Sequence, residues 1–264
     1  MIMKRISIFF LLLLMAVSVQ AHYSSVNRLQ PDTPAVTGVP RLKIGIGRYS
    51  PPFAMESSPS VLYGFDITLT QYLCKALNRT CQLIPLRFTQ LLTAVENNEI
   101  DMAIGAITIT SERSQQVNFT TAYFPSQSHF IGPSQLASQP FTLELLGNKK
   151  FGIEAGSIFS KQIEELGIKN PKLNIFESED NLIEALSAGD VDVALMDAPT
   201  ARYWENHSAD KLKVIGPQFP FGFGYGIAVN KNNLILLQAL NKKIHEFQQS
   251  HAFKDAYKMY FEEF

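Results

Sequence analysis

Residues 101–124 read DMAIGAITITSERSQQVNFTTAYF, and this stretch indicates both a fold and a binding site. The apolar run Met102–Ile107 is typical of a strand buried on both faces. The hydroxyl and acidic residues after it are typical of a helix start, because their oxygens accept hydrogen bonds from the free N–H groups of a first turn. In open α/β sheets, ligands bind outside the carboxyl ends of the strands. We therefore expect Arg113, whose planar guanidinium can donate two hydrogen bonds to one carboxylate, to hold a carboxylate there.

Short strands and amphipathic helices alternate twice along the chain. This β-α-β-α-β order with short connections implies parallel pairing and an α/β class. The first block has strands at 42–47, 82–86 and 102–107 and helices at 65–78 and 90–97. The second block has strands at 151–155, 172–176 and 191–196 and helices at 157–166, 180–188 and after Pro199. A strand at 211–215, another at 222–229 and helices at 234–249 and 252–261 complete the order. Residues 48–55 are expected to be a loop, and 126–150 to connect the two blocks.

Two such blocks predict two lobes, each a mostly parallel sheet flanked by helices. We expect residues 41–126 and 224–264 to form lobe 1 and residues 127–223 to form lobe 2. The chain would cross between the lobes near 125–130 and 219–225, which predicts a hinge. A small ligand is then expected in the cleft between the lobes.

The first 40 residues are expected to lie outside this fold. Residues 1–21 resemble a secretory signal, with Lys4 and Arg5 before an apolar run and cleavage predicted after Ala21. Residues 22–40 are polar and proline-rich and are expected to be a flexible leader. Removing the signal leaves 23 − 2 = 21 basic against 24 acidic residues, which gives no support for binding nucleic acid or an anionic membrane. In an exported protein, the pair Cys74 and Cys81 predicts a disulfide.

The strand ends carry the candidate ligand-binding residues. Arg113 in lobe 1 and Asp197 in lobe 2 have the charges that a zwitterion requires, and Ser157 at a helix start can add a donor to the carboxylate. A purely structural role stays open for both charges, because Arg113 could only pair with Glu112 and Asp197 could be the N-cap of the helix after Pro199. The histidines have no metal-ligand spacing and no phosphate-binding glycine loop is present, so we expect no metal and no cofactor.

The sequence also resembles the periplasmic solute-binding proteins of polar amino-acid ABC transporters, whose fold is the two-lobed type II binding fold. The resemblance extends over 42–264, and its run T-x-T-x-x-R followed by F-T-x-x-Y is specific. The matching stretches are YSPPF at 49–53, GFDI at 64–67, DMAIGAITITSER at 101–113, FTTAYF at 119–124, AGS at 155–157, DVDVALMDAP at 190–199 and GYGIAV at 224–229.

The resemblance implies a role for each matching residue. It implies that Arg113 clamps the α-carboxylate of an amino acid with help from Ser157. It implies that Thr108 and the backbone carbonyl of Ala106 meet the α-amino group, which pairs with Asp197. The aromatic residues Phe88 and Tyr49 are expected to be walls of the side-chain pocket.

The spacing of Cys74 and Cys81 and the TSERSQQVNFTTAYF run are most like the arginine, lysine and histidine binders. Members with cationic ligands carry an acid before the first aromatic residue, and this chain has Arg48 there instead. Glu154 lies where members more often carry a neutral residue or lysine, so it is a candidate partner for a cationic side chain, although it could also be an exposed strand-end carboxylate. A basic amino acid is therefore expected, with glutamine or another neutral polar amino acid as the alternative.

The resemblance further implies a monomer in the periplasm that closes on its ligand and delivers it to a membrane permease. We expect a binding protein and not an enzyme. An enzyme on the same scaffold, related to periplasmic dehydratases of cyclic acids, is the alternative of a different class. It would need a general acid or base in the cleft, for which Glu154 and His129 are candidates.

Overall fold

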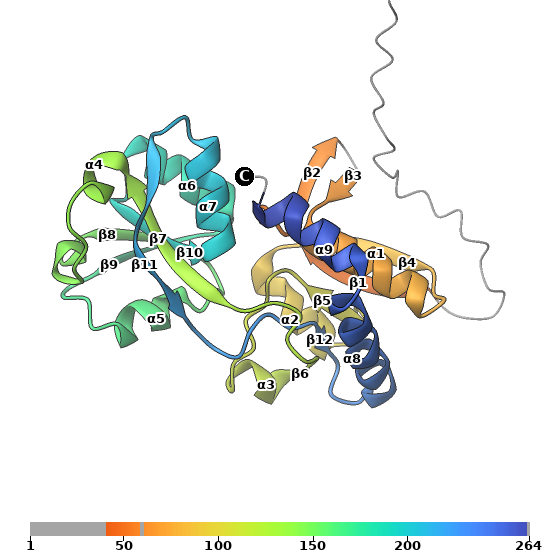
Figure 1. Cartoon of the computed structure of the whole chain (residues 1–264). Coiled ribbons are helices and arrows are strands. Elements are labelled where there is room, and N and C mark those ends of the chain that lie inside the picture. The colour runs from red at the N-terminus through yellow and green to blue at the C-terminus, as the bar shows by residue number, and fades with distance from the viewer. Residues whose placement is uncertain (1–40, 59–60, 263–264) are drawn as a thin grey trace, which may run out of the picture. The chain divides into compact units, whose positions relative to one another are not determined.

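The computed structural model describes residues 41–58 and 61–262, and within them the strands form two five-stranded sheets and one hairpin (Figure 1). The predicted signal at 1–21 and leader at 22–40 lie outside the described residues. In the described part of the chain, none of the helices combines the length and the apolar composition that a membrane span requires.

The first sheet combines strands from both ends of the described chain, in the order β4 (Cys81–Leu86), β1 (Leu42–Gly47), β5 (Met102–Ile104), β12 (Ala228–Val229) and β6 (Asn118–Phe119). The first three are parallel, and β12 is antiparallel to both of its neighbours. The helices with this sheet are α1 (Phe65–Ala76), α2 (Phe88–Glu96), α3 (Arg113–Gln116), α8 (Leu234–Gln248), α9 (His251–Tyr257) and a π-helical turn at Lys258–Glu262.

Both faces of this sheet are covered, which explains the apolar run at 102–104. Met102 and Ile104 pack into the cluster that contains α1, α8 and α9, whereas Ala103 between them packs into the cluster of α2. Alternate residues of a strand point to opposite faces, so a strand between two helical layers must be apolar throughout. The predicted disulfide is confirmed, because Cys74 near the end of α1 is bonded to Cys81 at the start of β4.

The second sheet has the order β11 (Leu212–Pro220), β7 (Gln127–Pro133), β10 (Val193–Asp197), β8 (Lys150–Glu154) and β9 (Lys172–Phe176). Strands β10, β8 and β9 are parallel, and β7 is antiparallel to β10 and β11. Its core contains Phe130, Phe151 and Leu195, all fully buried. The helices of this part are α4 (Ser134–Ala137), a 3₁₀ turn at Glu144–Leu146, α5 (Phe159–Glu165), α6 (Glu179–Ala188) and α7 (Ala198–His207).

Two segments connect the sheets and are hydrogen-bonded to each other. The Tyr225 N–H donates to the Phe124 carbonyl at 2.8 Å, and the Tyr123 N–H donates to the Tyr225 carbonyl at 2.9 Å. The Gly224 N–H also donates to Oγ of Ser126 at 3.1 Å. The predicted α/β fold with two sheets and two connections is confirmed, while the lobe boundaries at 126/127 and 223/224 stay a prediction.

Several element predictions were wrong in extent. The loop at 48–55 leads into a hairpin of β2 (Met55–Ser58) and β3 (Val61–Tyr63), and the connecting region at 126–150 contains β7, for which no strand was predicted. The predicted strand at 222–229 is reduced to Ala228–Val229, since Gly222 and Gly224 adopt positive φ angles that a strand does not use. The strand at 102–107 ends at Ile104 for the same reason, because Ala106 has φ of 47°.

Candidate functional site

Arg113 begins the short helix α3 and reaches across to the second sheet. Its Nη1 donates to the Thr108 carbonyl and its Nη2 donates to the Gly156 carbonyl, both at 2.9 Å. The guanidinium carbon lies 5.3 Å from the centre of the Phe88 ring. Burial lowers the pKa of Arg113 to about 10, although the nearby charge of Asp197 raises it. Among the described residues, Arg113 has no ion-pair partner within 4.0 Å, so it does not pair with Glu112 in that way.

Asp197 is the last residue of β10 and precedes α7. It occupies the N-cap position, but its side chain accepts no capping hydrogen bond. Its Oδ1 instead accepts a hydrogen bond from the Tyr225 hydroxyl at 2.6 Å. Burial raises the pKa of Asp197 to about 7, although the bond from Tyr225 and the charge of Arg113 lower it. The carboxylate is therefore oriented by the segment that connects the sheets and not by the helix that follows it.

One small cavity brings together nearly all of the predicted site residues. It has a volume of about 20 Å³ and is lined by the ends of β8 and β10 of the second sheet and by loops and helices next to the first sheet. A volume of this size holds about one water molecule, so a larger ligand requires the two sheets to move apart. The predicted residues that line it are Phe88, Ala106, Thr108, Arg113, Glu154, Ser157 and Asp197, and the remaining lining residues are Ser50, Gly105, Ile158 and Phe159.

Two predicted residues make contacts that the sequence did not indicate. The Ser157 hydroxyl donates to the Glu154 carbonyl at 2.6 Å, so in this structure it is engaged in a turn. Tyr49 does not line the small cavity. Burial raises its pKa strongly, and the charges of Tyr203, Asp180 and Glu179 raise it further. Tyr49 thus lies near an acidic part of the protein at the start of α6.

That acidic part consists of Glu154, Glu179, Asp180 and Asp197, which we call the acidic cluster. Burial, with the charges of Asp197 and Asp180, raises the pKa of Glu154 to about 8. Burial and the charge of Glu154 raise the pKa of Glu179 well above its ordinary value, while Oε1 of Glu179 accepts a bond from Trp204 at 2.7 Å. Within the described ranges, none of the four carboxyls forms an ion pair within 4.0 Å. A cation entering this cluster would relieve the mutual repulsion.

Glu179 and Asp180 are the residues that sequence reasoning missed. They follow Ser178, whose hydroxyl caps α6, and acids in a first turn are ordinary helix-start residues. Their position in the sequence, shortly after β9, could have indicated them. The strands β8, β9 and β10 are parallel, so residues that follow them lie at the same edge of the sheet.

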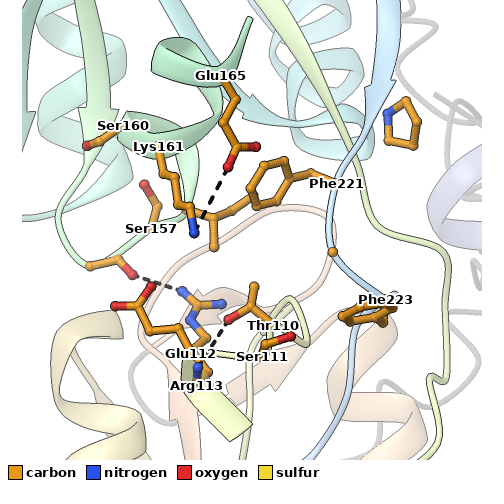
Figure 2. A pocket seen from close by; sticks show the side chains of 14 residues that line it. Thr110, Ser111, Glu112, Arg113, Ser157, Ser160, Lys161, Glu165, Phe221 and Phe223 are labelled. Carbon is orange, nitrogen blue, oxygen red and sulfur yellow. Dashed lines mark hydrogen bonds and ion pairs between the residues drawn. The ribbon is translucent and has the colours of Figure 1, made fainter. Parts of the chain in front are cut away.

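A larger cavity of about 610 Å³ lies beside the small one and shares Arg113, Ser157 and Ile158 with it (Figure 2). Figure 2 shows Lys161 and Glu165, both on α5 and 4.0 Å apart, on one side of it with Phe221 beside them, and Glu112 and Arg113 below them. Neither Asp197 nor Glu154 lines this cavity. A zwitterion needs an anion opposite the arginine, so the small cavity has the better charges although it is the smaller of the two.

The candidate general bases are separated. His129 is buried in β7, its Nε2 lies 2.8 Å from the Gly216 carbonyl, and it does not line the small cavity. Burial lowers its pKa. Of the two candidate bases, only Glu154 lines the small cavity. Among the described residues, no group of three or more His, Cys, Asp or Glu side chains is arranged to hold a metal ion.

Comparisons with known proteins give one consistent result. Residues 42–263 match the family described as bacterial extracellular solute-binding proteins, family 3. The histidine-binding periplasmic protein of Escherichia coli (strain K12) is 28% identical over 240 residues, which cover 87% of this chain and 91% of that protein. The ABC transporter arginine-binding protein 1 of the same strain is 29% identical over 210 residues, covering 77% and 84%. The crystal structure of an arginine 3rd transport system periplasmic binding protein from Legionella pneumophila superposes with a TM-score of 0.77 at 30% identity, covering 84% and 99%.

Proposed function

Since the chain belongs to the bacterial extracellular solute-binding proteins, family 3, we propose that it binds a basic L-amino acid, arginine or lysine, and delivers it to the permease of an ABC transporter. The observation that carries the proposal is that Arg113 of α3, beside the first sheet, and Asp197, at the end of β10 in the second sheet, line the same cavity. In this proposal Arg113 and Ser157 bind the α-carboxylate. Asp197, Thr108 and the Ala106 carbonyl bind the α-ammonium, which needs acceptors only.

The acidic cluster supports a cationic side chain over a neutral one. A ligand held by its zwitterionic end between Arg113 and Asp197 would extend its side chain along the Phe88 wall toward Glu154. Buried carboxyls attract a guanidinium or ammonium group strongly once they are ionised, because the dielectric constant around them is low, and the bound cation in turn lowers their pKa values. Glutamine carries no charge there and would leave the repulsion within the cluster unrelieved. The relatives named above for histidine and arginine agree with this choice.

Hinge closure is the mechanism that fits these contacts. The Arg113 guanidinium already bonds to the Gly156 carbonyl of the second sheet. A ligand carboxylate would replace that carbonyl as the acceptor, because its two hydrogen bonds to the guanidinium are charge-assisted and therefore stronger. A ligand that contacts both lobes only when they are closed shifts the open–closed equilibrium toward the closed form. We propose that the permease recognises this form, in the periplasm, and that the protein acts as a monomer without a cofactor.

Titration calorimetry of the protein with arginine, lysine, histidine and glutamine tests the proposal. We expect arginine or lysine to bind at least about 10-fold more tightly than glutamine, which corresponds to one surplus ionic interaction. Tighter binding of glutamine would refute the basic-ligand proposal while leaving an amino-acid binder. Product formation from a cyclic acid by the same preparation would instead support the dehydratase alternative, with Glu154 as general acid. We expect a stoichiometric complex and no product.

A further inference from the structure

Asp66, in the first turn of α1, is a fully buried carboxyl that no part of the proposed site accounts for. It is 0% exposed. Its Oδ2 accepts hydrogen bonds from the Ala106 N–H at 2.9 Å and from the Tyr123 hydroxyl at 3.1 Å. Its Oδ1 is buried without a partner in the described structure. Burying a carboxyl costs free energy unless its hydrogen bonds compensate, so those two bonds must do something that an apolar residue would not do.

The bond to Ala106 supports an unusual backbone conformation. Ala106 has φ of 47°, in the left-handed region that residues other than glycine seldom adopt. Ala106 lies just after the end of β5, where the chain leaves the sheet. Its N–H donates a hydrogen bond to the carboxylate of Asp66 and not to the backbone of a neighbouring strand. A strained non-glycine residue persists only where its surroundings hold it, and such residues gather at binding sites.

Ala106 is also where the ligand site begins. It lines the small cavity together with Thr108, Arg113 and Asp197, whereas Asp66 does not touch the cavity. We propose that Asp66 is a positioning residue, which fixes the backbone of Ala106 so that its carbonyl can accept a hydrogen bond from the α-ammonium of the ligand. This inference rests on the proposed function, because it assigns one residue behind the ammonium subsite of the same site.

The second bond of Asp66 links the two halves of that subsite. The Tyr123 hydroxyl donates to Asp66, the Tyr123 N–H donates to the Tyr225 carbonyl at 2.9 Å, and the Tyr225 hydroxyl donates to Asp197 at 2.6 Å. Both tyrosines are buried, and their ring centres lie 6.4 Å apart. One buried network thus holds Ala106 from the first sheet and Asp197 from the second, which are the two acceptors on either side of the ammonium.

The test compares two ligands that differ only in the α-amino group, L-arginine and 5-guanidinopentanoic acid. Asp66→Ala removes the acceptor behind Ala106, and we expect its affinity for arginine to fall at least about 10-fold, as for a lost hydrogen bond to a charged group. Its affinity for 5-guanidinopentanoic acid should change less than about 2-fold, because that ligand has no ammonium to place. Asp66→Asn keeps an acceptor oxygen and should restore most of the arginine affinity.

Thr70→Ala is the matched control. Thr70 is buried in the same helix and its hydroxyl is also without a partner in the described structure, so it reproduces a polar truncation that does not touch Ala106. We expect it to lower the melting temperature without separating the two ligands. If Asp66→Ala does not fold by circular dichroism, Asp66→Glu takes its place, because the longer side chain keeps a carboxyl but cannot keep the 2.9 Å bond to Ala106.

Equal losses for both ligands, or no loss for either, would overturn the positioning role and leave the proposed function intact. A wild-type protein that binds neither arginine nor lysine would refute the proposed function, and the inference with it. The result expected is a loss confined to the ligand that carries the ammonium.

Discussion

The Tyr225 hydroxyl lies 2.6 Å from Oδ1 of Asp197, and this bond joins the segment between the sheets to the end of β10. Tyr225 is fully buried and packs edge to face on Phe53 at 5.4 Å and parallel to Phe124 at 6.3 Å. Its ring position is therefore fixed by the first sheet, while its hydroxyl acts on the second. A carboxylate oriented from the connecting segment can respond to movement between the two sheets.

Tyr225→Phe should weaken ligand binding without unfolding the protein. The variant keeps the aromatic packing and removes the hydroxyl that donates to Asp197 and lies 3.4 Å from the Gln127 carbonyl, so the pKa of Asp197 should rise further above about 7. At neutral pH more of Asp197 would then be protonated and neutral. We expect about a 5-fold loss of affinity for arginine, which lies within the range for one hydrogen bond to a charged group. Calorimetry measures it, and Tyr257→Phe, on the half-exposed face of α9, is the control that should change nothing.

Arg113→Ala should abolish most of the binding. The guanidinium makes two hydrogen bonds of 2.9 Å here and is expected to make two to a ligand carboxylate. Losing a bidentate, charge-assisted pair should cost at least about 100-fold in affinity, and Arg113→Lys, which keeps the charge but not the planar fork, at least about 10-fold.

The control for this series is Arg202→Ala. Arg202 is also paired, with Glu205 at 2.7 Å, but it is exposed on α7 and lines neither described cavity. It should bind arginine as the wild type does, since an exposed ion pair contributes little. Unchanged affinity in Arg113→Ala, with its fold intact by circular dichroism, would contradict the assignment of Arg113.

The fold was predictable where hydrophobic pattern and topology agree. The alternation of Leu42–Gly47 predicted β1 to the residue, and the strand predicted at 172–176 matches β9 to the residue. The sequence failed where backbone conformation competes with composition. FGFGYGIAV has the residues of a strand, but Gly222 and Gly224 take positive φ angles to pass close to the chain at 108–126. Such choices depend on tertiary contacts that no local pattern contains.

The site was predictable to the extent that it lies at strand ends. Arg113 and Asp197 were expected opposite each other because both follow buried strands, and both line one cavity. Glu179 was not expected, since an acid after a serine cap is typical of any helix start. Asp66 likewise appears as an ordinary first-turn acid of α1. Burial distinguishes these two acids from ordinary helix-start residues. It results from the packing of helices against sheets whose strands are far away in the sequence, so no local pattern indicates it.

Glu154→Gln should change the ligand preference. Replacing the carboxyl by a neutral amide removes one group that can become charged when a cation binds, but keeps the shape of the side chain. We expect the affinity for arginine and lysine to fall about 10-fold and that for glutamine to change less than about 2-fold. Only arginine and lysine have a charged side chain that the Glu154 carboxylate can attract. Competition binding of the three ligands measures it. Glu164→Gln, an exposed position on α5, is the matched control, and equal effects on all three ligands would remove the case for a cationic ligand.

The disulfide should contribute stability and not function. Cys74 and Cys81 are seven residues apart and close a small loop between α1 and β4. The loss of loop entropy in the unfolded chain predicts about 2.5 kcal/mol, which lowers the melting temperature by about 5–10 °C in a chain of this size. The double variant Cys74→Ser, Cys81→Ser should show this decrease by differential scanning calorimetry. Its arginine affinity should equal that of the wild type, since neither cysteine lines a described cavity.

The raised carboxyl pKa values predict opposite effects of pH on binding and on the stability of the unliganded protein. Folding raises the pKa of Glu154 from 4.5 to about 8, so the folded state binds this proton more tightly than the unfolded state. The contribution of Glu154 to the free energy of unfolding is then complete below about pH 4.5 and is lost as the pH rises toward about 8. Binding of a cation needs the charged carboxylates, so the affinity should rise over the same interval.

We therefore expect the affinity for arginine to increase at least about 10-fold between about pH 5.5 and about pH 8, with protons released on binding as the cation lowers the carboxyl pKa values. Calorimetry in two buffers of different ionisation enthalpy counts those protons. In Glu154→Gln the part of the increase above about pH 7 should disappear, while the part due to Asp197, whose pKa is about 7, should remain. An affinity for arginine that does not change with pH would contradict the participation of both carboxyls, since a guanidinium stays charged throughout this range and cannot compensate for their loss of charge.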